Sequence, residues 1–341
     1  MEPMPTDAQW SALTALPAKR DEFGRDLYFR ATWLDLLDVV GPGAVAELQR
    51  VALLSFKCEA VVGRRMQEIV EFVERHGFHL VHIALTRHTR HSMREVWRYN
   101  WHVYTRDRLR LMSVLHTAND IAVLILWDDE YDGRIAGSVR LASLKGSADG
   151  STRDPSTLRT ALRPPSPGLN FVHVADEPAD IVREIGIFLG SDERWRALED
   201  TMSNGPAGHR TDAAATLQDL ERRYPAHDLD SSLALKRIEE AGVVDQAAIE
   251  RLRSSLGPDG ERLSWGELRS YISPSTGLVD EWDFITIAAE ALSGARAGVA
   301  EPLPGVSPEA WLAHRASGSN DAGPGDQVSA ASDPTSGAVE G

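Results

Sequence analysis

The stretch Asn170-Phe171-Val172-His173-Val174-Ala175-Asp176 decides the fold of the central part of this chain. Its apolar residues predict a short strand that ends at His173, and Pro178 predicts the start of a helix soon afterwards. The later stretch Arg183-Glu184-Ile185-Gly186-Ile187-Phe188 would lie on that helix, with Glu184 on its second turn. The carboxylate of Glu184 could therefore reach the histidine.

A histidine at the end of a strand can act as a nucleophile. Neutral imidazole attacks phosphorus and leaves again readily, which suits a two-step transfer through a phosphohistidine. Glu184 could accept a hydrogen bond from the ring nitrogen that does not attack and so fix the tautomer. The alternative is that His173 is a packing residue, as histidines on apolar strands commonly are.

Four further motifs precede or accompany the histidine. They are Leu54-Ser55-Phe56-Lys57, His76-Gly77-Phe78, Asn119-Asp120-Ile121-Ala122-Val123-Leu124 and Ser156-Thr157-Leu158-Arg159, and they are followed by Asn170-x-x-His173. In this order they resemble the motifs of the nucleoside diphosphate kinase family, from about residue 51 to about residue 195. The resemblance implies an α+β, ferredoxin-like βαββαβ domain.

The resemblance also implies roles for particular residues. His173 would accept and donate the phosphoryl group, and Glu184 would orient it. Lys57, Arg159 and Asn170 would bind the phosphates and ribose of a nucleotide such as ATP, and Mg²⁺ would enter with that nucleotide.

Two further nucleotide ligands are expected only as substitutes for family residues. Tyr99 would replace a tyrosine beside the γ-phosphate, whose ungapped position holds Asn100. Arg140 would replace a helix arginine whose position holds Ser138.

The chain also departs from the family. It has Val174-Ala175 where the family has Gly-Ser after the histidine, and Cys58-Glu59 where the family has Pro-Asp after the lysine. No aromatic for stacking a base is found among residues 108–110.

These departures keep two alternatives open beside a kinase that phosphorylates nucleoside diphosphates. One is a weak or inactive nucleotide-binding regulatory protein. The other is a biosynthetic phosphotransferase with a small-molecule acceptor that is not a nucleotide.

Composition limits the partners. The formal net charge of −15 argues against general nucleic-acid binding, which rests on neutralising phosphates. The single cysteine, Cys58, excludes an intramolecular disulfide, and no apolar run reaches the ~20 residues that a membrane span needs. We therefore expect a soluble, cytoplasmic protein with no membrane partner, able to form a homo-oligomer.

Four segments are predicted along the chain. Residues 1–50 would form a helical extension, 51–195 the nucleoside diphosphate kinase-like domain, 196–300 a helical domain and 301–341 a disordered tail. A surface loop is expected over residues 145–168, because glycine and proline are frequent there, and it carries Arg153, Arg159 and Arg163.

A protein-bound metal is not expected. His79 and His82 are separated by an odd number of positions, so on a regular strand they would face opposite sides of the sheet.

Overall fold

The computed structural model describes residues 3–148, 154–203, 213–257, 259–274 and 277–320. Its centre is a four-stranded antiparallel sheet in the order β2-β3-β1-β4. The strands are β1 (Val51–Phe56), β2 (Phe78–Thr86), β3 (Ile121–Asp128) and β4 (Val172–Val174). With helices in the β1–β2 and β3–β4 connections, this order is the ferredoxin-like one, and the predicted α+β fold is confirmed.

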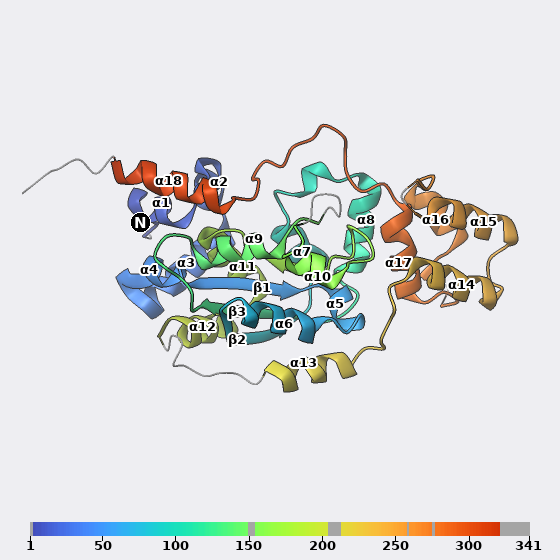
Figure 1. Ribbon diagram of the computed structural model, residues 1–341, viewed down its shortest axis with the longest axis horizontal. Coiled ribbons are helices and arrows are strands. Elements are labelled where there is room, and N and C mark those ends of the chain that lie inside the picture. The colour runs from blue at the N-terminus through green and yellow to red at the C-terminus, as the bar shows by residue number, and fades with distance from the viewer. Residues whose placement is uncertain (1–2, 149–153, 204–212, 258, 275–276, 321–341) are drawn as a thin grey trace, which may run out of the picture.

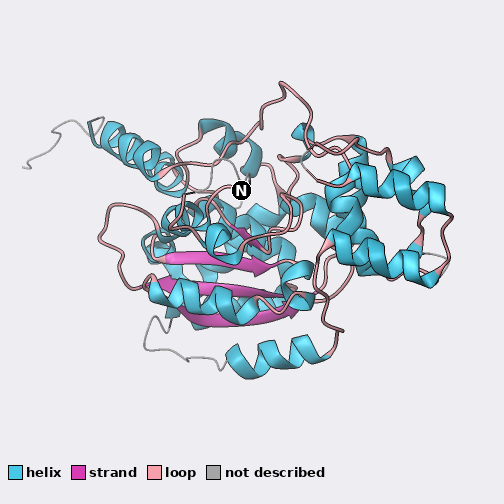
Figure 2. Cartoon of the chain, turned by 45° about the vertical axis from the view of Figure 1, so that its right-hand side comes forward, coloured by secondary structure: helices cyan, strands magenta, loops and turns pink. Residues whose placement is uncertain are grey.

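Helices lie around the sheet, and they come before, between and after its strands in the sequence (Figure 1, Figure 2). Before β1 lie α1 (Asp7–Leu13), α2 (Pro17–Phe23), α3 (Leu27–Val40) and α4 (Ala44–Leu48). Between the strands lie α5 (Cys58–Val62), α6 (Met66–Arg75), α7 (Arg90–Val96), α8 (Arg106–Leu115), α9 (Gly137–Lys145) and α10 (Leu158–Leu162), with a 3-10 turn, η2 (Trp101–Val103), between α7 and α8. After β4 follow α11 (Pro178–Phe188), α12 (Ser191–Leu198), α13 (Ala213–Arg222), α14 (Ser231–Ala241), α15 (Gln246–Ser255), α16 (Trp265–Tyr271), α17 (Glu281–Ala291) and α18 (Pro308–Asn320).

Each face of the sheet has its own apolar core. One core joins the sheet to α3, α7, α11 and α12, and the other joins it to α5, α6, α10 and α13. β1 is buried along its whole length, since it lies between β3 and β4 and is covered on both faces. Lys57, directly after β1, is thereby held at a fixed end of the sheet.

The helix that carries Glu184 packs closely on α3. A Cβ added at Gly186 would lie 2.5 Å from Thr32 Oγ1 and 2.8 Å from the carbonyl oxygen of Tyr28. Glycine at this point of α11 therefore permits the two helix backbones to approach. The N-terminal helices thus support the back of the helix that presents Glu184.

The sheet contains one irregularity that the sequence pattern does not reveal. The register of β2 against β3 shifts between Leu80 and His82, so that His79 pairs with Trp127 and His82 pairs with Ile125. Residues two apart on β3 face the same side, so the prediction that His79 and His82 face opposite sides is wrong.

The C-terminal helices form a separate apolar cluster. α14, α15, α16 and α17 bury their side chains against one another and against α8, in the lobe at the right of Figure 1. None of the helices in the described chain is both long and apolar enough to cross a membrane.

Helices occur in two segments where the sequence predicts none, the surface loop over residues 145–168 and the disordered tail over residues 301–341. Within residues 145–168, α10 buries Leu158 and Leu162. Beyond residue 301, α18 forms because Ser307 accepts a hydrogen bond from the backbone of Ala310 and Trp311 is fully buried beside Ala136 and Val139. The expected disorder of the tail is therefore wrong for residues 308–320. Arg153 and residues 321–341 lie outside the described residues.

Candidate active site

His173 and Glu184 form a close pair. Nε2 of His173 lies 2.9 Å from Oε1 and 2.8 Å from Oε2 of Glu184. Glu184 is buried, and His173 is partly exposed. Because the carboxylate accepts, Nε2 carries the ring proton and Nδ1 keeps its lone pair. Nδ1 makes no hydrogen bond to any residue that the structure describes.

An unusual backbone turn places the residues before His173. Phe171 has φ of 69°, in the left-handed region that residues with a side chain rarely adopt. Its N–H donates to Glu59 Oε1 (3.1 Å), and its carbonyl accepts from the N–H of Lys57 (2.8 Å). Glu59 is fully buried, so the glutamate that departs from the family pattern has a structural role in holding this turn.

Asn170 connects the two predicted phosphate ligands. Its Oδ1 accepts from Lys57 Nζ at 2.5 Å and from Arg159 Nη2 at 3.2 Å, and its amide nitrogen donates to the carbonyl of Pro167 at 2.9 Å. Arg159 also donates to the carbonyls of Gly146 and Val172. Lys57, Arg159 and Asn170 thus form one hydrogen-bonded cluster.

A cavity of about 730 Å³ opens onto this cluster. His173, Lys57, Arg159 and Asn170 line it, together with residues from the end of α7, the end of α9 and the segment before α18. The cavity therefore brings a candidate nucleophile and two cations to a common space.

The electrostatics around the cavity favour an anion. Burial lowers the pKa of Lys57, an effect that Glu59 opposes and that the neighbouring cations Arg159, Arg108 and Lys145 reinforce. Arg108 is buried, and its guanidinium has no hydrogen-bond partner among the described residues. Positive charge is therefore concentrated beyond what the buried Glu59 compensates, which is the property of a phosphate site.

The cavity wall also contains an ion pair. Lys145 Nζ lies 3.1 Å from Asp176 Oδ1. Burial acts to raise the pKa of Asp176, but Lys145, Lys19 and His173 outweigh it and the pKa is lowered. Asp176 is accordingly an ionised partner of Lys145. Cys58 has no such activation, because burial raises the pKa of its thiol to about 12.

Two predicted ligands lie elsewhere. Tyr99 packs against Phe23 of α2, with ring centroids 5.8 Å apart, and does not line the cavity. Arg140 forms an ion pair with Asp128 and donates to the carbonyl of His76, because it projects from the first turn of α9 while the cavity lies at the last. Both expectations are wrong.

The cavity wall also contains residues that the sequence did not predict. Trp97, Asn100 and Tyr104 line it. Asn100 stands at the ungapped family position, so keeping register without slippage would have found it. Trp97 and Tyr104 carried no motif signal.

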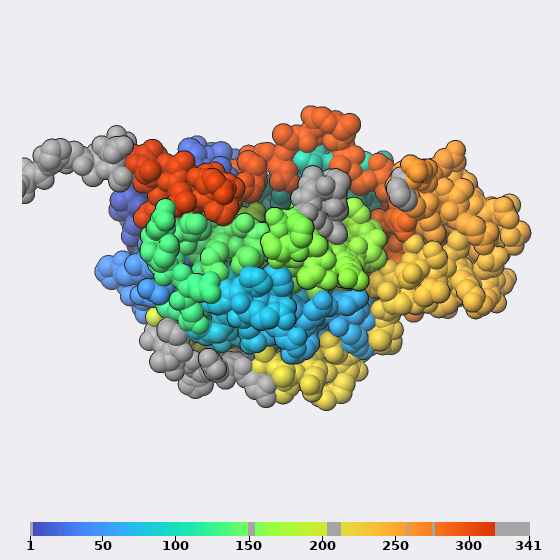
Figure 3. Space-filling view, viewed as in Figure 1, coloured from blue at the N-terminus to red at the C-terminus, as the bar shows by residue number. Residues whose placement is uncertain are grey.

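The remaining wall comes from a segment that we call the strap, residues 293–307. Thr105 N–H donates to the carbonyl of Gly294 and Arg296 N–H to that of Val103, while Trp311 of α18 anchors the far end. Between these anchors Glu301 and Gly305 line the cavity. Figure 3 shows the strap and α18 passing over the molecule from the helical lobe toward the N-terminal helices.

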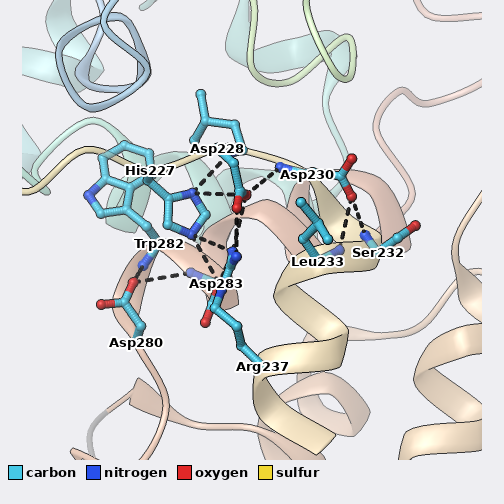
Figure 4. A network of polar contacts seen from close by, with 10 residues as sticks. His227, Asp228, Asp230, Ser232, Leu233, Arg237, Asp280, Trp282 and Asp283 are labelled. Atoms are coloured by element: carbon cyan, nitrogen blue, oxygen red, sulfur yellow. Dashed lines mark hydrogen bonds and ion pairs between the residues drawn. The ribbon is translucent and has the colours of Figure 1, made fainter. Parts of the chain in front are cut away.

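One group of side chains in the described chain has the spacing of a metal site, but an arginine already forms an ion pair with one of its members. His227, Asp280 and Asp283 place ligand atoms within 4.8 Å of one another (Figure 4). Arg237 bonds to Asp283 at 2.6 Å and to Asp228 at 2.6 Å, and His227 Nδ1 accepts from the backbone of Leu229. Arg237 thus already pairs with two carboxylates of this network and links α14 to α17.

Comparison with known proteins gives similarity to solved structures. No protein-family model matches this chain, and no curated protein does. The structure of the nucleoside diphosphate kinase from Aquifex aeolicus matches at 17% identity and a TM-score of 0.35, covering 42% of this chain and 97% of that one. The match spans less than half of the present chain.

Two further solved structures give the same result. The enzyme from Halobacterium salinarum, in complex with CDP, matches at 20% identity and a TM-score of 0.35 over 42% of this chain and 89% of that one. The one from Encephalitozoon cuniculi matches at 14% and 0.36, over 42% and 90%.

Proposed function

We propose that this protein is a phosphotransferase that moves the γ-phosphoryl group of a nucleoside triphosphate through a phosphohistidine at His173. The acceptor is a nucleoside diphosphate or another small phosphate acceptor. One observation carries the proposal: the Glu184-bound imidazole of His173 lines a cavity whose wall also contains Lys57 and Arg159.

The chemistry follows from which ring nitrogen is available. Nδ1 of His173 attacks the γ-phosphorus and forms an N–P bond, while the bond from phosphorus to the β,γ-bridging oxygen breaks and the nucleoside diphosphate leaves with that electron pair. The ring gains positive charge and keeps its proton on Nε2, where Glu184 stabilises it. An acceptor oxygen then attacks the same phosphorus, and the N–P electron pair returns to Nδ1.

The cations have the complementary task of holding the triphosphate. Phosphoryl transfer depends mainly on positioning and on neutralising charge, which Lys57 and Arg159 supply. Mg²⁺ would enter as the nucleotide complex. Two carboxylates line the cavity, Asp176 and Glu301, but they come from different segments and Asp176 is already paired with Lys145. We therefore do not expect them to form a dedicated Mg²⁺ site.

The proposal is tested by incubating the full chain with γ-labelled ATP and Mg²⁺. We expect label on the protein that acid releases and base does not, on the peptide that contains His173. Regiochemical analysis should identify phosphate on Nδ1, since Nε2 is bound to Glu184. A screen of nucleoside diphosphates and other acceptors then follows loss of the label. A protein that binds ATP but takes up no label would refute phosphotransfer.

A second candidate function is nucleotide binding without transfer, with occupancy read out by the helical lobe. The strap favours it, because it joins α17 to the cavity wall and contributes Glu301 and Gly305 to that wall. ATP binding that alters protease cutting within residues 293–307, in a protein that remains unlabelled, would support this alternative.

Nucleotide affinity is expected to fall as the pH rises above neutrality. Burial lowers the pKa of Lys57 to about 7, and a bound phosphate should raise it again because it stabilises the ammonium. Affinity is therefore greatest below the pKa of the free protein and declines by about tenfold per pH unit until the pKa of the complex is reached. Calorimetry from about pH 6 to 9, in buffers of different ionisation enthalpy, should show uptake of about one proton.

Lys57→Met is the control for this pH dependence. It removes the titrating group but leaves the titration of the nucleotide's own phosphate. At low pH the variant should bind the nucleotide more weakly than the wild type does. As the pH rises, its affinity should fall less steeply than that of the wild type, because only the nucleotide's own phosphate still titrates. Equal slopes for the two proteins would show that Lys57 does not bind phosphate.

A further inference from the structure

Trp97 contacts both reactive ends of the candidate site. Its ring centroid lies 5.3 Å from that of His173, with the two planes at 75°. The ammonium of Lys57 lies 5.8 Å from the centroid, over the ring. Trp97 follows the last residue of α7, so a helix end fixes its backbone. A single indole therefore adjoins the candidate nucleophile and a candidate phosphate ligand.

Trp97 is itself held by other rings. His116 stacks on it at 4.4 Å and 26°, and His88 lies against it at 5.7 Å. His116 is buried, and neither of its ring nitrogens has a hydrogen-bond partner among the described residues. Burial lowers the pKa of both histidines, that of His88 to about 4, so the two rings are neutral at physiological pH. They act as flat packing surfaces that restrict the rotation of the indole.

The contact of Trp97 with His173 restricts the orientation of the imidazole ring. Glu184 binds only Nε2, so the imidazole can still tilt about that hydrogen bond and move Nδ1 away from an in-line approach. A rigid ring against its side removes this freedom. Reaction rates respond strongly to such alignment, because a displacement of about 1 Å can cost about 10²-fold.

We infer that Trp97 is a positioning residue for His173, which holds the imidazole so that Nδ1 faces the cavity. This inference rests on the proposed phosphotransfer for its kinetic consequence. Its geometric content, a fixed orientation of His173, does not depend on that function.

The kinetic test compares three variants of the full chain. Trp97→Ala should slow phosphohistidine formation by about 10²-fold, with an unchanged Kd for ATP. Trp97→Phe keeps a flat ring and should recover most of the rate. Trp101→Ala removes an indole from the same connection but outside the cavity, and it should behave as the wild type.

A second measurement does not require any activity. In ¹⁵N-histidine-labelled protein, the two ring nitrogens of His173 give separate signals, which report the environment and the mobility of each nitrogen. All variants should keep the proton on Nε2, because Glu184 is unchanged. The Nδ1 signal should be sharp in the wild type and in Trp97→Phe, and it should shift or broaden in Trp97→Ala. If circular dichroism shows that Trp97→Ala is unfolded, Trp97→Leu takes its place, because it keeps apolar volume without a flat ring.

The outcomes separate the two proposals. An unlabelled wild type would refute phosphotransfer, while the ¹⁵N measurement of the His173 ring would still decide the role of Trp97. A Trp97→Ala or Trp97→Leu protein with the rate and the His173 signals of the wild type would overturn the inference. A slow variant with unchanged signals and a weakened Kd would also overturn it, since Trp97 would then bind nucleotide instead.

Discussion

His173→Ala should bind ATP and take up no labelled phosphate. The substitution removes the imidazole that lines the cavity and is held by Glu184, while Lys57 and Arg159 remain to bind phosphate. Labelling by γ-labelled ATP, with affinity measured in parallel by calorimetry, checks both parts of this expectation. Label on His173→Ala equal to that on the wild type would place the chemistry elsewhere.

Glu184→Gln should slow the labelling of His173 without abolishing it. The amide keeps a hydrogen-bond acceptor for Nε2 but loses the charge that stabilises the ring as the N–P bond forms. We expect slower labelling by about 10²–10⁴-fold, the usual range for a group that assists proton placement. His79→Ala is a matched control, because His79 is bonded to Asp129 and does not line the cavity. Slow labelling in this control would indicate a general loss of structure.

The His173–Glu184 pair could be predicted because it depends on short-range rules. An apolar strand, a proline at the start of a helix and a carboxylate one turn further on determine where both side chains lie. Lys57, Arg159 and Asn170 are close to motif ends in the same way, and the structure brings them together.

Other parts of the site depend on information that no local pattern contains. Tyr99 lies outside the cavity because a shift of one residue decides which side of the turn a side chain occupies. Arg140 lies outside it because it is at the opposite end of α9 from the cavity. The shift at Leu80/His82 inverts the facing of a strand in the same way. The strap comes from a segment more than a hundred residues after His173, and its far end is anchored by Trp311, which is buried in one cluster with Val306.

Asp26→Ala should lower the free energy of unfolding more than the loss of a partly exposed ion pair on the same helix does. Asp26 accepts from the backbone N–H groups of Tyr28 and Phe29 at the start of α3 and also binds Arg183 at 2.9 Å. Arg183 is only 2% exposed and directly precedes Glu184. Removing one partner of a buried ion pair costs about 3–5 kcal/mol, and loss of the helix cap adds about 1 kcal/mol. Urea unfolding followed by circular dichroism measures the change.

Two variants separate the contributions to this loss. Asp26→Asn keeps an oxygen that can cap α3 but leaves Arg183 only the more distant carboxylate of Glu95, at 3.5 Å, so its destabilisation reports loss of the close buried pair. Asp35→Ala breaks the pair with Arg194 on the same helix, where both side chains are partly exposed, and it should cost at most about 1 kcal/mol. If Asp26→Ala were no worse than Asp35→Ala, the pair would not hold α11 against α3. The N-terminal helices would then contribute little to the position of Glu184, and loss of Asp26 would also leave phosphohistidine formation unchanged.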